Sequence, residues 1–313
     1  MLVIPELLTF LAAAETENFS EVARRLGMSQ PSVSMQIRAL ETRMGVELFH
    51  RSGRSVTLTE AGQALVPLAR RLADQAVHAE EAMASHTGEV VGRLRIVCTT
   101  TAGKYLLPQL VSGLLTRHPM VSVDCQVVHR GLAIDRLCDG HAQLGVTSLR
   151  EGSDDTLEYR PFVTDRIALI APVDHPWATR KKAITPADLT TEKFILREDA
   201  SGTQHAVREA LAWHDLNLDD LHTVMNMGNA EAIRMAVQER IGVGFVSVLV
   251  AREAVDAGHL AMVPVKGLDI TKTLYMIRDR RRPATPAQTA FWDYAFAPEN
   301  ELVRELPNLI GAA

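Results

Sequence analysis

The chain has 313 residues, 47% of them hydrophobic, which is enough for two or three domains with sizeable cores. Its net charge of -5 and pI of about 6.1 exclude a protein that coats nucleic acid through overall positive charge. The apolar run from Leu7 to Ala14 is too short for a membrane span and follows Glu6 rather than a basic segment. We therefore expect no secretory signal, no membrane partner and a cytoplasmic location.

The chain contains three cysteines, Cys98, Cys125 and Cys138, each in apolar surroundings. An odd number of cysteines in a cytosolic chain argues against a disulfide framework and indicates buried, inert thiols. A redox switch would need an exposed thiol of low pKa. A redox-responsive regulator that uses cysteine therefore remains an alternative.

Two helices are expected at the N-terminus. The first runs from Pro5 to about Glu15, and a short amphipathic helix follows with Ser20 as its N-cap. Gly27 supplies the sharp turn after it. The residues expected to face inward are Leu7, Phe10, Leu11, Ala14, Val22, Ala23 and Leu26.

A third helix is expected directly after this turn. Ser29 can cap it, and Pro31 lies in its first turn, where a missing N–H costs nothing. Two short helices joined at a glycine turn form a helix-turn-helix unit, whose second helix reads the major groove. The buried stripe of the second helix should comprise Val33, Ile37, Leu40 and Met44.

A basic segment follows this helix pair. Leu48 and Phe49 are apolar anchors, Arg51 and Arg54 flank a glycine turn, and residues 56–58 alternate in the manner of a strand. A basic wing of this kind lies along phosphates or enters a minor groove.

The outer face of the second helix carries groups that can read base edges. Gln30 suits adenine, Arg38 suits guanine or phosphate, and Met35 can meet a thymine methyl. The alternative is a plain solvated helix face, which the Ser-Gln-Pro cap, the glycine turn and the basic wing together disfavour. The candidate DNA-contacting residues are Ser29, Gln30, Pro31, Ser32, Ser34, Met35, Arg38, Arg51 and Arg54.

At these residues the chain resembles the LysR-type transcriptional regulators. Family members often carry Arg where Met35 stands, which leaves the preferred bases at that position open. The resemblance rests on Asn18-Phe19-Ser20, Ala23, Leu26, Ser29-Gln30-Pro31, Val33-Ser34, Gln36-Ile37, Leu40-Glu41, Gly45, Leu48-Phe49, Arg51 and Leu58-Thr59-Glu60-Ala61-Gly62.

A long helix is expected from Thr59 or Glu60 to about Ser85. Its apolar residues recur every three or four positions and indicate a coiled coil; the alternative is a helix that lies on its own domain. The family resemblance implies a linker helix that pairs two DNA-binding heads. The seam residues are Leu65, Leu68, Leu72, Ala76, Ala79 and Met83.

Beyond a two-glycine hinge at residues 87–92, predicted strands alternate with helices, which is typical of an α/β domain. The strands are expected at Leu94–Cys98, Val121–Val127, Gln143–Val146, Leu157–Phe162, Arg166–Ala171, Phe194–Leu196, Val224–Met227, Gly242–Val246, Leu260–Val263 and Thr273–Ile277. The helices are expected at Tyr105–Arg117, Ile134–Cys138, Gln204–His214, Ala230–Glu239, Val248–Ala257 and Pro286–Ala297.

The resemblance implies an α/β fold with an N-terminal all-α winged helix-turn-helix and a two-subdomain effector domain like a periplasmic binding protein. Two crossing strands would join the subdomains. The expected division is the DNA-binding domain at 1–59, the linker helix at 60–86, the hinge at 87–92, subdomain I at 93–163 and 269–300, subdomain II at 164–268, and a tail at 301–313.

A small ligand is expected in the crevice between the subdomains, at the carboxyl ends of strands. Two loops place hydroxyls and backbone N–H groups at helix N-termini, which favour an anion; the alternative is that these residues are only helix caps. The candidate effector-binding residues are Thr99, Thr100, Thr101, His129, Arg130, Thr147, Ser201, Gly202, Thr203, Asn229, Phe245 and Ser247.

Catalytic and cofactor motifs are not recognisable. Residues 215–219 begin in the manner of a calcium loop, but Asp220 stands where the loop needs glycine. There is no phosphate-binding loop, no nucleophile elbow and no convincing metal-ligand pairing, so no cofactor or metal is expected. An enzyme with an accessory DNA-binding head and a pure solute-binding protein are the weaker alternatives.

The sequence therefore predicts a transcriptional regulator that responds to a ligand and is not an enzyme. Its expected partners are double-stranded promoter DNA with an interrupted palindrome, a small anionic effector, and a second or further copies in a homodimer or homotetramer. RNA polymerase is a further candidate partner. The effector would alter the arrangement of the oligomer on DNA.

Overall fold

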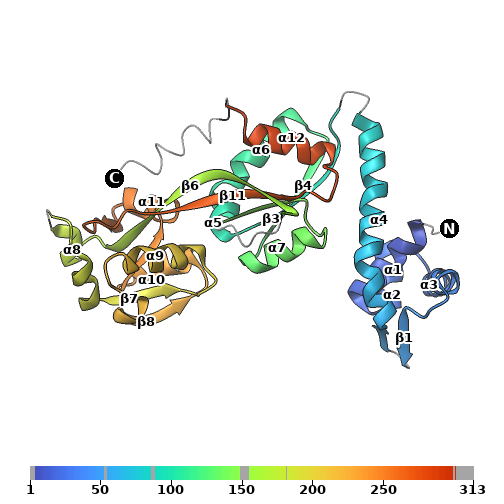
Figure 1. Cartoon of the computed structure of the whole chain (residues 1–313), viewed down its shortest axis with the longest axis horizontal. Coiled ribbons are helices and arrows are strands. Elements are labelled where there is room, and N and C mark those ends of the chain that lie inside the picture. The colour runs from blue at the N-terminus through green and yellow to red at the C-terminus, as the bar shows by residue number, and fades with distance from the viewer. Residues whose placement is uncertain are drawn as a thin grey trace. The chain divides into compact units, whose positions relative to one another are not determined.

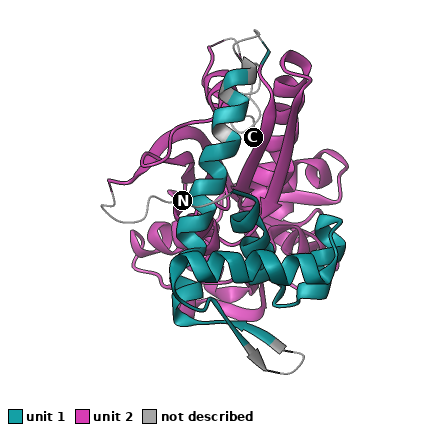
Figure 2. Cartoon of the chain, turned by 90° about the vertical axis from the view of Figure 1, so that its right-hand side faces the viewer, with its two compact units in different colours: residues 1–89 teal, residues 90–313 magenta. Residues whose placement is uncertain are grey.

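The computed structural model describes residues 4–52, 55–85, 89–148, 155–180, 182–298 and 300. The chain divides into two compact units, residues 1–89 and residues 90–313, which are coloured teal and magenta in Figure 2.

Unit 1 is a helical domain with a β wing (Figure 1). The antiparallel strands β1 and β2 form the wing, and the Phe49 ring of β1 lies 5.6 Å from the Phe10 ring and 5.5 Å from the Phe19 ring. These aromatic contacts anchor the wing to the helices. The elements are α1 (Ile4–Thr16), α2 (Phe19–Leu26), α3 (Gln30–Met44), β1 (Phe49–Ser52), β2 (Ser55–Leu58) and α4 (Glu60–Ser85).

The turn between α2 and α3 is the one the sequence predicts. Gly27 has φ +65°, a left-handed conformation that glycine adopts without steric cost. Ser29 is the N-cap of α3, and its Oγ accepts a hydrogen bond from the backbone N–H of Ser32 at 3.3 Å. The predicted helix-turn-helix is therefore confirmed.

The expected N-cap of α2 is wrong. The cap is Asn18, whose Oδ1 accepts hydrogen bonds from the backbone N–H groups of Ser20 at 3.0 Å and Glu21 at 3.1 Å. The helix begins two residues earlier than expected because Phe19 must enter the core, where it is 7% exposed. Leu26, expected to face inward, is instead 39% exposed.

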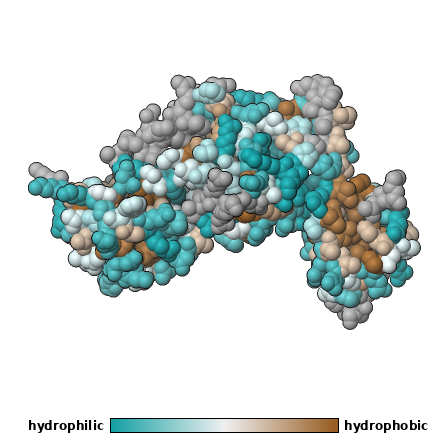
Figure 3. Space-filling model, viewed as in Figure 1, coloured by the Kyte–Doolittle hydropathy of each residue, from teal (hydrophilic) through white to brown (hydrophobic). Residues whose placement is uncertain are grey.

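Some apolar residues of the long helix α4 are buried in unit 1, and others are exposed to solvent. Leu65 and Ala69 are buried in the core of unit 1, so this part of the helix lies on its own domain and Leu65 is not a free seam residue. Leu68, Leu72 and Met83 remain exposed. Figure 3 shows apolar residues gathered on this unit.

Unit 2 is built on a mixed sheet whose described strands follow the order β4-β3-β5-β11-β6-β9-β7-β8, with β10 paired to β6. Helices flank the sheet (Figure 1). The strands are β3 (Gly92–Cys98), β4 (Val121–Val127), β5 (Leu144–Ser148), β6 (Leu157–Pro172), β7 (Lys193–Arg197), β8 (His222–Met227), β9 (Val243–Ser247), β10 (Leu260–Val263) and β11 (Ile270–Asp279). The helices are α5 (Thr100–Tyr105), α6 (Leu107–Arg117), α7 (Arg130–Cys138), α8 (Pro176–Thr179), α9 (Gly202–Ala212), α10 (Ala230–Gln238), α11 (Val248–Asp256) and α12 (Pro286–Ala295), with 3-10 turns at Pro186–Thr191 and Leu218–Asp220.

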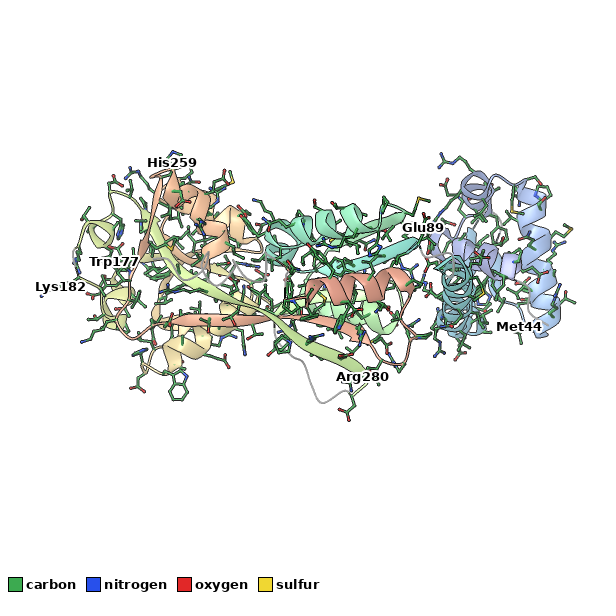
Figure 4. All side chains as sticks on the ribbon, turned by 90° about the horizontal axis from the view of Figure 1, so that it is seen from above. Met44, Glu89, Trp177, Lys182, His259 and Arg280 are labelled. Atoms are coloured by element: carbon green, nitrogen blue, oxygen red, sulfur yellow. The ribbon has the colours of Figure 1, made fainter. Side chains whose placement is uncertain are left out.

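The long strands β6 and β11 connect two halves of this unit. The first half contains β3, β4 and β5 with α5, α6, α7 and α12, and the second contains β7 to β10 with α8 to α11. Figure 4 shows the two strands running between the end that carries Trp177 and His259 and the end that carries Arg280. The predicted two-subdomain α/β fold is confirmed.

Several boundaries differ from the sequence expectation, two of them by more than a shift of an end. The strands expected at 157–162 and 166–171 form the single strand β6, because residues 163–165 continue the antiparallel pairing with β11. The helix expected at 105–117 corresponds to α6, which begins at Leu107, and the separate helix α5 before it was not expected. Pro108 lies in the first turn of α6 and has no backbone N–H with which to continue α5, so a new helix begins there.

None of the helices in the described part of the chain combines the length and the hydropathy that a membrane span requires.

Replacing Asn18 with Ala should lower the free energy of unfolding of unit 1 by about 1 kcal/mol, because two backbone N–H groups lose their acceptor. Urea unfolding followed by circular dichroism measures the change. Ser20→Ala is the matched control, since Ser20 is exposed and follows the cap. Equal losses from both variants would contradict the assignment of the cap.

Candidate nucleic-acid interface and ligand pocket

The face of α3 opposite its buried stripe is exposed and polar. Val33, Ile37 and Leu40 are fully buried, which fixes the rotation of the helix about its axis. Gln30 lies on the outer face, and its Nε2 donates to Ser34 Oγ at 3.2 Å. The helix therefore presents its polar groups to solvent because its apolar groups fill the core.

The structure places seven of the nine candidate DNA-contacting residues at the start and along the outer side of α3. Met35 is the most prominent apolar member, with 67% of its surface exposed. The side chain of Arg51 and the whole of Arg54 lie outside the described residues. Ser29, Gln30, Pro31, Met35 and Arg38 are exposed, and Ser32 and Ser34 are half-buried.

The wing is held to α3 by a carboxylate. Glu41 Oε1 accepts hydrogen bonds from the backbone N–H groups of Leu48 at 3.0 Å and Phe49 at 3.3 Å. Backbone groups that bind a carboxylate hold the start of β1 against the helix. The start of the wing is therefore joined directly to α3 within unit 1.

Unit 2 contains a cavity of about 240 Å3 between its halves. Loops at the carboxyl ends of β3, β4 and β5 line it from the first half, and the loop after β7 and the start of α9 line it from the second. The lining residues are Thr99, Thr100, Thr101, Val127, Val128, His129, Arg130, Ser148, Arg197, Glu198, Ala200, Ser201, Gly202, Thr203, Gly228 and Lys272.

Eight of the twelve candidate effector-binding residues line this pocket: Thr99, Thr100, Thr101, His129, Arg130, Ser201, Gly202 and Thr203. Four do not, because they have other roles. Thr147 is fully buried in β5, and Phe245 is stacked on Phe194 in the core with the ring centroids 5.9 Å apart. Asn229 caps α10, and Ser247 caps α11 and donates to Asp165 Oδ1 at 2.6 Å.

Two of the residues that line the pocket, Ser201 and His129, also act as helix N-caps. Ser201 Oγ accepts from the backbone N–H of Gln204 at 3.4 Å, and His129 Nδ1 accepts from Leu132 N–H at 3.2 Å. Because Nδ1 is the acceptor, a neutral His129 carries its proton on Nε2. Thr99 occupies the N-cap position of α5 without a side-chain cap bond.

Sequence reasoning missed the charged residues at the second half of the pocket. Lys272 lies on β11, and its side chain is only 8% exposed. Arg197 ends β7 and pairs with Glu198 at 2.8 Å. A lysine within a predicted strand carries no local signal of burial, so only the fold brings it to the pocket.

Lys272 belongs to a buried polar cluster. Its Nζ donates to Thr203 Oγ1 at 2.6 Å and lies 3.2 Å from Asp165 Oδ2, and the Asp165 side chain is fully buried. Burial lowers the pKa of Lys272 below its usual 10.5, and Asp165 opposes this shift.

The halves also meet through Tyr105 of α5 and Glu231 of α10. The Tyr105 hydroxyl donates to Glu231, which also pairs with Lys104 at 2.9 Å and Arg234 at 3.2 Å. Burial raises the pKa of Glu231, but the hydrogen bonds from these three side chains outweigh it and hold the pKa below its usual 4.5. Glu231 is therefore a charged contact between the halves.

The expectation that all three cysteines are buried holds for Cys98 only: Cys125 is exposed on β4, and Cys138 is half-buried on α7. The Sγ of Cys125 lies 3.6 Å from the Sγ of buried Cys98. The hydrogen bond between the two lowers the pKa of Cys125 and raises that of Cys98. The redox-responsive alternative remains a prediction.

A winged helix-turn-helix with an exposed polar helix face, joined in one chain to a two-lobed α/β unit with a charged pocket, defines a ligand-responsive DNA-binding protein. Residues 4–63 match the family described as bacterial regulatory helix-turn-helix protein, lysR family, and residues 87–297 match the LysR substrate binding domain. The chain belongs to the LysR family: it is a DNA-binding transcriptional regulator with an effector-binding domain, not an enzyme.

The similar proteins cover most of the chain. The uncharacterized HTH-type transcriptional regulator MJ0300 of Methanocaldococcus jannaschii is 32% identical over 91% of this chain and 96% of its own length. The transcriptional activator CmpR of Synechocystis is 31% identical over 92% of this chain and 93% of its own length.

Solved structures show the same fold. Full-length OxyR from Pseudomonas aeruginosa is 22% identical, with a TM-score of 0.70 over 97% of this chain and 95% of that one. The regulatory domain of Synechocystis CcmR, described in complex with 2-PG, is 27% identical, with a TM-score of 0.59 over 66% of this chain and 96% of that one.

Proposed function

We propose that this regulator recognises its DNA sites through α3 and the wing, and that a small organic anion bound in the pocket of unit 2 controls that recognition. The observation that carries the effector class is the charge of the pocket. Arg130, Arg197 and Lys272 line it together with His129, against the single lining carboxylate of Glu198 among the described residues.

Three features of the pocket support an acidic ligand. The N-terminus of α9 directs backbone N–H groups toward it, and a helix N-terminus favours an anion. The threonine and serine hydroxyls supply further donors. The CcmR regulatory domain, which is described with bound 2-PG, has the same fold. The proposed effector is therefore a compact phosphate or carboxylate compound.

On the DNA side, Gln30, Met35 and Arg38 are the residues we propose for base contacts, because they are exposed on α3. Ser29, Pro31, Ser32 and Ser34 fit contacts at the edge of the groove, and Arg51 and Arg54 of the wing fit phosphates.

The DNA site bound by a pair of DNA-binding domains would be an interrupted palindrome in a promoter. RNA polymerase is the proposed further partner there. The regulator acts on chromosomal DNA, so we propose a cytoplasmic location.

The exposed apolar residues of α4 support pairing of two copies. Leu68, Leu72 and Met83 are between 42% and 64% exposed and lie on one face of the helix, although water disfavours such surface. A second α4 packed along this helix would bury it in a coiled coil. A homodimer, or a homotetramer built from dimers, is the proposed assembly. We also propose that the chain divides as expected into a DNA-binding domain at 1–59, a linker helix at 60–86 and a hinge at 87–92.

Gln30→Ala should change which base is preferred at one position, with a loss of about 1–3 kcal/mol of discrimination. Selection from random DNA followed by competition binding with substituted sites measures this. The exposed Arg117→Ala, on α6, is the control and should leave base preference unchanged. A uniform loss of affinity for all sites from Gln30→Ala would contradict a base-reading role.

Organic acids that fit the pocket should raise the melting temperature of the full-length protein, because a ligand that binds only the folded state stabilises it. Differential scanning fluorimetry with phosphate, phosphoglycolate, phosphoglycerate and neutral glycerol tests this. Thr101→Ala and Ser201→Ala should reduce the shift and leave DNA affinity without effector nearly unchanged. Thr116→Ala, an exposed hydroxyl on α6, is the control. An unchanged shift in both pocket variants would contradict the assignment of the pocket.

Leu72→Glu should weaken self-association by about tenfold or more, because the charge would be buried between paired helices. Sedimentation equilibrium measures the dissociation constant. Val173→Glu places the same charge on an exposed apolar position of unit 2 and serves as the control. Identical association of the Leu72 variant and the wild type would exclude this face of α4 from the interface.

A further inference from the structure

Lys272 has a capacity for hydrogen bonding that its protein partners do not fill. An ammonium group can donate three hydrogen bonds; among the described residues Thr203 accepts one of them, and Asp165 Oδ2 lies 3.2 Å away as the ion-pair partner. The side chain is nearly buried, yet it lines the pocket. The remaining donor is therefore available to a ligand.

Lys272 shares this end of the pocket with a second cation, Arg197. Asp165 is the carboxylate partner of Lys272, and Oδ1 of that carboxylate is already engaged by the Ser247 hydroxyl at 2.6 Å. Arg197 is close enough to Lys272 to lower its pKa, so positive charges adjoin one another at this end of the pocket. A second anion at this place would relieve the repulsion.

We infer that Lys272 binds the acidic group of the effector and that Asp165 competes with the effector for the same ammonium. The inference rests on the proposed function, since it assigns the residue that recognises the anion and the contact that changes when the anion binds.

The competition has a structural consequence because of where the pair lies. Lys272 and Asp165 are direct register partners on β11 and β6, the strands that connect the halves of unit 2. An anion that shares the ammonium weakens its attraction to Asp165. The ligand thereby acts on the connection between the halves.

The carboxylate of Asp165 is also connected to α11 through hydrogen bonds. Asp165 accepts from Ser247, which caps α11 by accepting from the Leu249 N–H at 3.2 Å. The side chain of Leu249 packs against the hydrophobic core of the first half. A change at Asp165 is therefore transmitted through α11 to a contact between the halves. Coupling between ligand and fold requires such a difference in contacts.

Isothermal titration calorimetry of the full-length protein with phosphoglycolate, phosphoglycerate and inorganic phosphate tests the inference. Lys272→Met should weaken binding by about 10- to 100-fold, the value of a hydrogen bond to a charged group. Asp165→Asn should have the opposite effect and tighten binding severalfold, because the competitor loses its charge. A purely structural ion pair would give losses in both variants.

The double variant Lys272→Met with Asp165→Asn guards against misfolding, because it leaves no uncompensated buried charge. It should bind as weakly as Lys272→Met. Lys266→Met removes an exposed lysine from unit 2 and should bind as the wild type does.

The outcomes separate the two proposals. Wild-type affinity in the double variant would overturn the role of Lys272, and weaker binding by Asp165→Asn would overturn the competition; in both cases an anionic effector would stand. If the wild-type protein binds none of these anions, the proposed effector class fails and the inference fails with it.

Discussion

The pairing of β6 with β11 is the constraint on which the organisation of unit 2 depends. Each strand takes part in the sheet of both halves: β11 pairs with β5 at one end, and β6 pairs with β9 and β10 at the other. The halves are therefore joined by paired strands, whose register shifts once, between Leu274 and Tyr275. The buried pair of Asp165 and Lys272 lies on these strands beside the pocket, so ligand chemistry and the connection between the halves meet at one place.

In unit 1 the burial of one helix face determines what the other face can do. Val33, Ile37 and Leu40 have no exposed surface, and the aromatic contacts of Phe49 hold the wing beside them. The polar groups of α3 are consequently exposed on the opposite face of the helix. The two sides of α4 differ in the same way: Leu65 and Ala69 pack in the core of unit 1, while Leu68, Leu72 and Met83 stay exposed.

The pocket combines contributions that no single segment supplies. Loops that follow β3, β4 and β5 contribute hydroxyls, imidazole and guanidinium, while the second half contributes the N-terminus of α9. These groups are hydrogen-bond donors, several of them with positive character, and the pocket brings them together. The charged contact of Glu231 with Lys104, Tyr105 and Arg234 joins the halves elsewhere, through α5 and α10.

The sequence by itself determined the features that depend on neighbouring residues. The turn at Gly27, the cap at Ser29, the buried stripe of α3 and nearly all strands follow from periodicity and local hydrogen bonding. Eight of twelve expected pocket residues also line the pocket, because helix N-termini after strands have a local signature.

Only the tertiary structure decided the rest. Residues 163–165 separate the two strands expected from the sequence, yet pairing with β11 makes them part of one strand. Leu65 fits a coiled-coil seam, yet the core of unit 1 buries it, and Cys125 is apolar in its sequence context, yet β4 exposes it. Lys272 has no local feature that distinguishes it from a surface lysine, yet the pairing of β11 with β6 places it opposite Asp165 and nearly buries its side chain. Burial and pairing between residues far apart in the chain are set by packing, and local sequence does not encode which distant segment will supply the neighbour.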